Sequence, residues 1–335
     1  MSRSADSAAT HAQAAEAERI IRGGSRSFAA AARLFDPQTR ISAHLLYAWC
    51  RHCDDQIDGQ ELGHGQEVLS DDERRARLDR LFDQTRAALA GRQVTDPVFS
   101  AFAGVVRQHA IPPELPIALI DGFALDVAGG TYADLDATLA YCWHVAGVVG
   151  VMMAMVMGAR REDVLDRACD LGLALQLTNI ARDVIDDARL GRVYLPLDAL
   201  ARHGVPVLRA DGSALPAMTV AARVADPAHR PAVWDATMDL LDAAEPYYAS
   251  ATAGLAHLPF RSALAVAAAR GIYRQIGRTL RQGGPRAWDR RVVVGTPARA
   301  GRLAEAIWIA GRAASIDRAR VAPPRTGLWT RPRPA

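Results

Sequence analysis

The stretch LQLTNIARDVIDDARLGRVYLP, which runs from Leu175 to Pro196, decides how this chain folds. Its apolar residues recur with the period of an α-helix. On the other side Asn179, Asp183 and Asp187 follow one another at i, i+4 and i+8, so they form one row along the helix. Burying an amide and two carboxylates in a row costs free energy unless partners compensate them. The stretch therefore predicts a helix with a functional polar face.

Two neighbours extend this row. Gln176 lies about one turn before Asn179 on almost the same face, and Arg182 stands beside the row. We expect Arg182 to form an ion pair with Asp186 at i+4 or to reach a phosphate. Hard oxygen ligands in such a row suit Mg²⁺, which keeps waters and is completed by substrate phosphate oxygens. The alternative is a solvated helix face neutralised by salt bridges.

A second acidic cluster, RHCDDQIDG, occupies residues 51–59 at the end of another apolar helical stretch. Asp54 and Asp58 are four residues apart and project from one face, whereas Asp55 points elsewhere. The C-terminus of a helix is the unfavourable end for negative charge. A positive partner such as a metal ion is therefore expected, and a merely solvated cluster is the alternative.

Two aspartate rows on separate helices indicate that both hold metal ions at one site. We expect Asp54 and Asp58, facing Asp183 and Asp187, to hold Mg²⁺, or alternatively Mn²⁺, against a diphosphate. Metal ions then stabilise the leaving pyrophosphate while an allylic C–O bond ionises to a carbocation. Such a cation needs an apolar cavity from which water is excluded. The apolar run Val145–Ala159, which is too short to cross a bilayer, is expected to line that cavity.

The rest of the chain is helical in pattern, so the sequence predicts an all-α fold. Breaks fall at Asp36-Pro37, Gly91, Pro112-Pro113 and Gly129-Gly130, while the stretch from Gly204 to Pro231 is expected to be a loop with one short helix. We expect a disordered tail at residues 1–18, one helical domain at 19–315 and a Pro/Arg-rich tail at 316–335. The expected helices are 27–35, 40–58, 72–90, 96–109, 113–127, 134–158, 162–187, 232–254, 260–282 and 297–315.

The composition excludes several functions. All 40 basic residues among the 335 are arginine, so Schiff-base lysine chemistry and a P-loop lysine are excluded. The net charge of +3 gives no global field for nucleic acid. No secretory signal is evident at the N-terminus, and the cysteines lie in apolar helical patterns, so buried thiols in the reducing cytoplasm are expected.

These motifs resemble the squalene/phytoene synthase family, and within it the bacterial phytoene synthases. The resemblance covers roughly residues 20–300, and its segments are long and ordered. They are GSRSFAAAARLF (24–35), YAWCRHCDDQIDG (47–59), YCWHVAGVVGVMM (141–153), LGLALQLTNIARDVIDDARLGRVYLP (171–196) and EPYYASATAGLAHLP (245–259). The implied fold is a single-domain isoprenoid synthase helical bundle with a central apolar cavity.

The resemblance also implies roles for individual residues. Asp54 and Asp58 correspond to ligands of one metal group, and Asn179, Asp183 and Asp187 to ligands of the other. Tyr141 resembles a residue that lines the ionisation site. The residues implied to contact substrate are Ser25, Arg26, Ser27, Tyr47, Arg51, Gln176, Asn179, Arg182, Tyr273, Arg291 and Arg299.

The implied activity is that of a prenyltransferase of carotenoid biosynthesis. Two molecules of geranylgeranyl diphosphate are expected to join head to head through prephytoene diphosphate, giving phytoene and diphosphate, with no need for NADPH. No nucleic acid partner is expected. The protein is expected in the cytoplasm. Because its substrate and product are apolar, peripheral contact with the inner face of the membrane is also expected.

Alternatives remain at this stage. Squalene synthase would need NADPH, and dehydrosqualene synthase would use the fifteen-carbon farnesyl diphosphate; small residues such as Ala154 and Gly158 favour the longer substrate. A chain-elongating prenyltransferase also uses two aspartate-rich helices. A non-catalytic scaffold relative would tend to lose the metal ligands, whereas both rows are complete here.

Two positions depart from the family pattern. Thr131 stands where arginine is common, and Arg299 stands where lysine is usual.

Overall fold

The structure is a computed structural model, and it describes residues 19–20, 26–60, 69–290, 292 and 295–333. For residues 26–28 and 296–297 it describes the backbone alone. The predicted N-terminal tail, residues 1–18, lies outside the described residues. Where the chain is described it is helical, with a single isolated bridge between Leu208 and Ala214 as its β-structure. The predicted all-α fold is confirmed.

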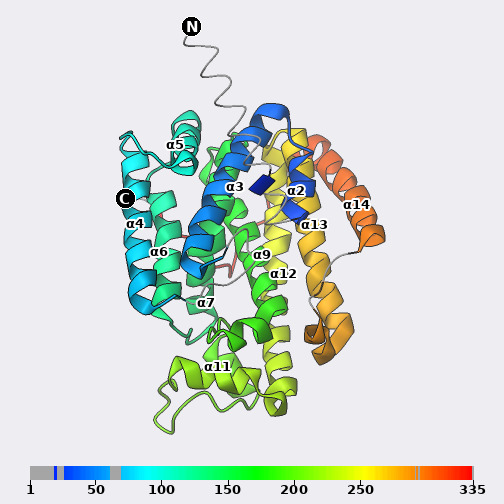
Figure 1. The fold of residues 1–335 in the computed structure, drawn as a ribbon. Coiled ribbons are helices and arrows are strands. Elements are labelled where there is room, and N and C mark those ends of the chain that lie inside the picture. The colour runs from blue at the N-terminus through cyan, green and yellow to red at the C-terminus, as the bar shows by residue number, and fades with distance from the viewer. Residues whose placement is uncertain (1–18, 21–25, 61–68, 291, 293–294, 334–335) are drawn as a thin grey trace.

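The order of the helices follows the sequence prediction closely (Figure 1). The helices are α2 (Arg26–Ala32), α3 (Pro37–Asp58), α4 (Asp71–Leu89), α5 (Pro97–His109), α6 (Glu114–Ala128), α7 (Leu135–Cys142), η1 (Trp143–Gly147), α8 (Val148–Val156), α9 (Glu162–Arg189), α10 (Leu197–Arg202), α11 (Ala217–Ala225), η2 (Pro227–His229), α12 (Arg230–Gly254), η3 (Leu255–His257), α13 (Phe260–Gly283), η4 (Gly284–Asp289), α14 (Thr296–Ser315) and η5 (Asp317–Ala319).

Helix α9 is the centre of the bundle. It packs against α8, η1, α12 and α13, while α3 to α6 lie on one side of it and α12 to α14 on the other (Figure 1). Glycines let the backbones of α8 and α9 approach each other. A Cβ at Gly150 would lie 2.4 Å from the carbonyl oxygen of Ala168, and one at Gly172 would lie 2.4 Å from that of Ala146. Because backbone atoms cannot move aside, only glycine fits at these two positions.

Helix α3 begins and ends where its sequence dictates. Asp36 caps the N-terminus by accepting hydrogen bonds from the N–H groups of Gln38 and Thr39, and Pro37 occupies the first turn. Gly59 ends the helix with φ of 63°, the left-handed conformation that favours glycine. The helix therefore stops directly after Asp58, which places both aspartates of its acidic row in its last two turns.

The cavity helix has the predicted length but is less regular than its sequence suggested. Residues Leu135–Val156 form one continuous helical stretch, which by length and composition alone could span a membrane. However, 61% of its most apolar window is buried inside the bundle, as expected for a core helix. The sequence pattern gave no sign that η1 inside it is a π-helix, an irregularity that often occurs at functional sites.

Two further segments differ from expectation. Helix α10 was not predicted, because six residues are too few to show helical periodicity, and α11 is the short helix expected between Gly204 and Pro231. Residues 316–333 have the composition of a loose end, yet they pack on the bundle and bury Arg331 to 4% exposure. The domain boundaries themselves remain a prediction.

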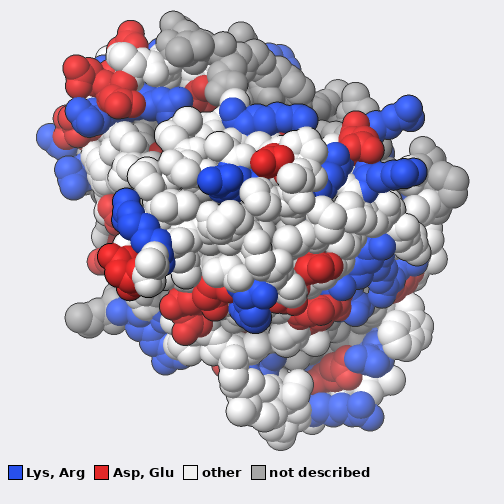
Figure 2. Space-filling view, turned by 90° about the horizontal axis from the view of Figure 1, so that it is seen from below, with Lys and Arg blue, Asp and Glu red and all other residues white. Residues whose placement is uncertain are grey.

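Figure 2 looks at the end of the bundle that carries α11. On this face arginine and acidic side chains are interspersed, and apolar and neutral surface separates them. A face of this kind offers no continuous basic stripe that would follow a phosphate backbone.

Candidate active site

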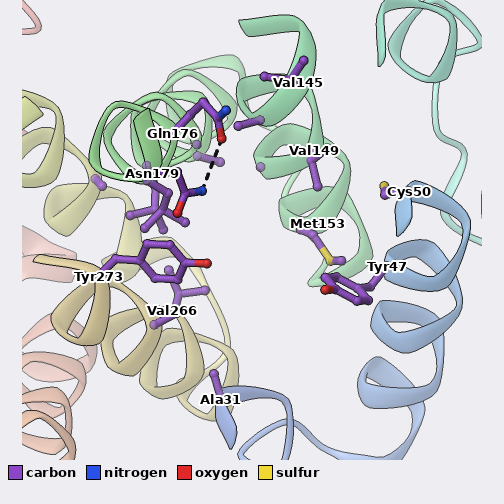
Figure 3. Close-up of a pocket in the computed structure, with 18 of the residues that line it drawn as sticks. Ala31, Tyr47, Cys50, Val145, Val149, Met153, Gln176, Asn179, Val266 and Tyr273 are labelled. Carbon is purple, nitrogen blue, oxygen red and sulfur yellow. Dashed lines mark hydrogen bonds between the residues drawn. The ribbon is translucent and has the colours of Figure 1, made fainter. Parts of the chain in front are cut away.

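A cavity of about 1020 Å³ lies between α3, α6, η1, α8, α9 and α13. In Figure 3, Tyr47 projects into it from α3, and Gln176 and Asn179 project from α9 on the opposite side. Val149 of α8 and Tyr273 of α13 line the walls between them. Most of the wall is apolar, as the sequence predicts, and the acidic side chains gather in one part of it.

The two predicted aspartate rows meet at this cavity. Asp54 and Asp58 from α3 line it together with Asn179, Asp183 and Asp187 from α9. The chain brings them together although more than a hundred residues separate the two rows in sequence. The expectation that two separate helices present their acidic rows to one space is confirmed.

Arginines neutralise these carboxylates. Arg51 forms an ion pair with Asp54 one turn later, and Arg182 binds the adjacent Asp183, with 2.8 Å between Nε and Oδ1. Arg192 donates from Nη2 to Oδ1 of Asp58 at 2.6 Å and thereby joins the end of α9 to the end of α3. The prediction that Arg182 pairs with Asp186 is wrong.

Asp186 points outward and binds Arg189 at 3.3 Å. Its side chain is 66% exposed, whereas that of Asp183 is 23% exposed. Arg182 therefore turns toward the cavity side of α9, where it lines the cavity.

Burial and crowding raise the pKa of two of the carboxyls. Desolvation raises the pKa of Asp54 to about 7, opposed by Arg51 and reinforced by Asp58. Desolvation and the neighbouring charge of Asp183 raise the pKa of Asp187 to about 8. Both shifts show that the local arginine charge does not fully offset the cost of ionising these groups, so a further cation would be favoured here.

The donor set fits a magnesium ion. Carboxylate oxygens from both rows are hard ligands, and the buried Oδ1 atom of Asn179 has no hydrogen-bond partner. The Nδ2 of the same amide donates to Gln176 at 3.3 Å, which leaves Oδ1 directed elsewhere (Figure 3). In the described parts of the chain no three His, Cys, Asp or Glu side chains converge on one point. An ion here would therefore draw the rest of its oxygen ligands from substrate and water.

A third carboxylate beside the rows was not predicted. Asp126 of α6 lines the cavity and accepts hydrogen bonds from Tyr141 at 3.1 Å and Tyr194 at 2.9 Å. The two tyrosine rings stack with centroids 4.8 Å apart. Desolvation raises the pKa of Asp126 to about 6, opposed by the charge of Arg192 and the hydrogen bond from Tyr194. The largely apolar stretch 113–127 holds two aspartates, Asp121 and Asp126, so the sequence alone did not indicate which of them faces the cavity.

The remaining predicted residues divide into two groups. Tyr47, Arg51, Gln176, Tyr273 and Arg299 all line the cavity, as does Tyr141. Ser25 and Arg291 lie outside the described residues, and the side chains of Arg26 and Ser27 also lie outside them. Beyond the prediction, Arg192 and Tyr194 also line the cavity; they follow the second row directly in the sequence GRVYLP.

The cysteines are free thiols. Cys53, Cys142 and Cys169 are buried, and Cys50 faces the cavity from α3 (Figure 3). Burial raises the pKa of the Cys50 and Cys53 thiols, so neither is activated as a thiolate. The expectation of unreactive thiols rather than a metal-binding CxxC agrees with this geometry.

The fold and the site together define a class. A helical bundle that encloses one apolar cavity, with two aspartate-bearing helices at its polar end, has the architecture of an isoprenoid synthase. The family model for squalene/phytoene synthase matches residues 21–298. The chain belongs to the squalene/phytoene synthase family.

Individual proteins of this family are similar to the chain over most of its length. It is 50% identical over 312 residues to the 15-cis-phytoene synthase of Paracoccus sp. (strain N81106 / MBIC 01143), covering 93% of this chain and 95% of that one. It is 48% identical to the 15-cis-phytoene synthase of Pantoea ananas, with 92% and 94% covered. Among solved structures, a dehydrosqualene synthase in complex with ligand matches with a TM-score of 0.76 at 25% identity, over 89% of this chain and 96% of that one.

Proposed function

We propose that this protein is a phytoene synthase, which joins two molecules of geranylgeranyl diphosphate head to head and forms phytoene through prephytoene diphosphate. The relatives named 15-cis-phytoene synthase, matched over almost their whole length, support the activity. The observation that carries the chemistry is the meeting of two aspartate rows and three arginines at one end of an apolar cavity.

Asp54, Asp58, Asn179, Asp183 and Asp187 are the residues that would hold magnesium. When bound, the metal would neutralise the diphosphate oxygens and so make pyrophosphate a better leaving group. Restoring the activity of metal-stripped protein with Mg²⁺ and with Mn²⁺ in turn tests this assignment.

The chain's own groups prepare the substrate for ionisation. Arg51, Arg182 and Arg192 present guanidinium donors that suit diphosphate oxygens, and binding the diphosphate would release them from their present carboxylate partners. The hydroxyl of Tyr141 donates to Asp126, which holds this aromatic residue in the cavity wall. An aromatic face attracts positive charge, so Tyr141 and its stacked neighbour Tyr194 are suited to stabilise an allylic cation.

The apolar wall determines what happens after ionisation. Val145, Val149 and Met153 turn toward the cavity from the helical stretch Leu135–Val156, which also carries Tyr141 (Figure 3). They surround the prenyl chain with groups that cannot attack a cation, and they exclude water that would capture it. The cation is then left to react with the double bond of the second substrate.

The test is to incubate the purified protein and Mg²⁺ with farnesyl or geranylgeranyl diphosphate, each with and without NADPH. We expect phytoene from the twenty-carbon substrate, and we expect NADPH to change neither its yield nor its identity. Product from farnesyl diphosphate alone would instead support dehydrosqualene synthase, and a requirement for NADPH would support squalene synthase. Either outcome would contradict the proposal.

For localisation we propose the cytoplasm, with α14 resting on the inner face of the membrane. Leu303, Ile307 and Trp308 on this helix are 41%, 52% and 62% exposed, an unusual set of apolar side chains for a free surface. Exposed arginines suited to anionic lipid headgroups follow them in the chain; these are Arg312, Arg318 and Arg320.

Vesicle co-sedimentation tests this placement. With vesicles that contain anionic lipid, we expect the wild type to sediment and Ile307→Asp with Trp308→Asp to remain in the supernatant. Met218→Asp is the matched control, because Met218 is 70% exposed on α11, away from α14. Equal sedimentation of all three proteins would refute the assignment to α14.

A further inference from the structure

A charged side chain, Arg167, lines the part of the cavity far from the aspartates. The cavity-lining residues of α9 follow one another at helical spacing from Asp183 through Asn179 and Leu171 to Arg167, and Val164 continues the lining about one turn further on. The helix rises about 24 Å between Asp183 and Arg167. This length is comparable with that of an extended twenty-carbon prenyl chain whose diphosphate lies at the aspartates. Arg167 therefore stands where such a chain would end.

Hydrogen bonds hold Arg167 across this end. Its Nη1 donates to the carbonyl oxygen and to Oγ of Ser250, both at 3.1 Å, and its Nη2 donates to the carbonyl oxygen of Pro323 at 2.5 Å. The absence of a side chain at Gly254 makes room for it, because a Cβ there would lie 3.0 Å from the Cβ of Arg167. Arg167 is 6% exposed, so its guanidinium is fixed by protein groups rather than by bulk water.

One of these partners belongs to the C-terminal segment 320–333, which we call the strap. Arg325 of the strap forms a bidentate pair with the fully buried Asp170 of α9, with distances of 2.8 and 2.6 Å. Arg331 and Arg333 both bind Asp166, at 2.8 and 2.9 Å. Three strap arginines thus neutralise two carboxylates on the turns of α9 that flank Arg167.

A second anchor lies between these ion pairs. The backbone N–H of Trp329 donates to the hydroxyl of Tyr247 on α12 at 3.0 Å, and its ring lies 6.5 Å from that of Trp143 in η1. The strap therefore contacts α12, α9 and η1 of the cavity helix together.

We infer that the strap fixes Arg167 as the end wall of the cavity and that this wall sets the longest prenyl chain the enzyme accepts. The inference rests on the proposed function. A longer chain would have to displace this guanidinium from its hydrogen bonds to Ser250 and Pro323 and leave a buried charge without those acceptors, which is costly. Arg167 acts here on substrate length, while the strap is a positioning element that acts through Arg167.

Replacing the wall tests the inference. In Arg167→Ala we expect the ratio of kcat/KM for a twenty-five-carbon prenyl diphosphate to that for the twenty-carbon substrate to rise by about tenfold or more, because the shortened side chain opens room for further carbons. Arg167→Met keeps much of the length without the hydrogen bonds, and we expect a smaller rise. An unchanged ratio in folded Arg167→Ala would overturn the inference. Should that variant not fold, an unchanged ratio in Arg167→Met would do so.

Arg270→Ala is the matched control. Arg270 is also buried, at 7% exposure, and donates to a backbone carbonyl of α12, that of Tyr248 at 2.9 Å, but it does not line the cavity. We expect this variant to lose stability without a change in chain-length ratio. If its ratio shifted as much as that of Arg167→Ala, general loosening of the bundle would be the cause and the inference would fail.

Arg325→Ala tests the strap separately. It removes the pair with Asp170 without altering any cavity-lining residue, so we expect a shift in the same direction as Arg167→Ala but smaller. A shift in Arg167→Ala with none in Arg325→Ala would overturn the role of the strap. All comparisons use the longest chain that the wild type accepts as reference. Failure of the proposed function, seen as wild-type turnover of farnesyl diphosphate alone, is therefore distinguishable from failure of this inference.

Discussion

Helix α9 carries two pairs of aspartates with the same spacing, and they have opposite surroundings. Asp183 and Asp187 line the cavity beside Arg182 and the unsatisfied oxygen of Asn179. Asp166 and Asp170, about five turns earlier on the helix, face the strap and are fully paired with its arginines. One pair therefore faces a space that can receive substrate, and the other faces protein.

This difference shows what a DxxxD spacing can and cannot indicate. The spacing places two carboxylates on one side of a helix in both cases. Whether they serve chemistry or packing depends on what the rest of the chain brings to that side. At the far end the C-terminal segment supplies the positive charge permanently, whereas at the polar end part of the compensation is left to a ligand.

The largest effect is expected from removing a carboxylate of the cavity pair. Asp183→Ala should lower turnover by roughly 10³-fold or more, because it takes away a ligand for the metal that would stabilise the leaving diphosphate. Its thermal unfolding midpoint should fall less than that of Asp170→Ala, because Asp183 is 23% exposed and relief of its repulsion with Asp187 partly offsets the loss of its pair with Arg182. Diphosphate release and circular dichroism measure the two quantities. Turnover within severalfold of wild type would refute the metal assignment.

The matching change in the α9 pair that faces the strap should have the opposite effect, a large loss of stability with little loss of turnover. Asp170→Ala leaves Arg325 without its buried partner and should reduce the free energy of unfolding by about 3–5 kcal/mol, as measured by urea denaturation. Well below the new unfolding temperature, turnover of the twenty-carbon substrate should stay within severalfold of wild type. A variant that is as stable as wild type but inactive would mean that the two pairs had been assigned the wrong way round.

The pH dependence of stability gives a third, smaller difference between the two aspartate pairs. The pKa of Asp187 is raised from 3.8 to about 8 and that of Asp54 to about 7, so the folded protein holds protons that the unfolded chain releases. In metal-free buffer the unfolding midpoint should therefore fall as pH rises from about 4 to about 8. Mg²⁺ binds the ionised forms, so its stabilising effect should grow over the same range. Asp187→Asn should flatten the metal-free slope; an unaltered slope would contradict the assignment.

The smallest effect is expected beside the cavity pair. Asp186→Ala changes the residue next to Asp187 in sequence, but this side chain is exposed and bound only to Arg189. Stability should change by about 0.5 kcal/mol or less, and turnover should match wild type. A strong loss of activity would show that sequence proximity to the row matters more than the direction of the side chain.

The sequence by itself determined the helices and the cavity residues that lie in ordered motifs. Helical periodicity predicted the ends of nearly every long helix to within a few residues, because the hydrophobic period and the capping residues are local properties of the sequence. The two aspartate rows, Tyr47, Arg51 and Tyr141 could be predicted because each lies in a stretch that matches a family pattern. Helix α10 and the π-helix η1 were missed, since neither has a local signature strong enough to stand out.

Only the tertiary structure decided which distant residues neutralise or hydrogen-bond each buried charged side chain. Asp126 gained its role from Tyr141 and Tyr194, Asp58 gained its partner from Arg192, and Arg167 is held by Pro323. A buried charge is tolerated only when its partner is in place, and that partner can come from any part of the chain. The sequence determined which side of α9 each aspartate occupies, and the packing of the whole chain decided which pair was left for substrate.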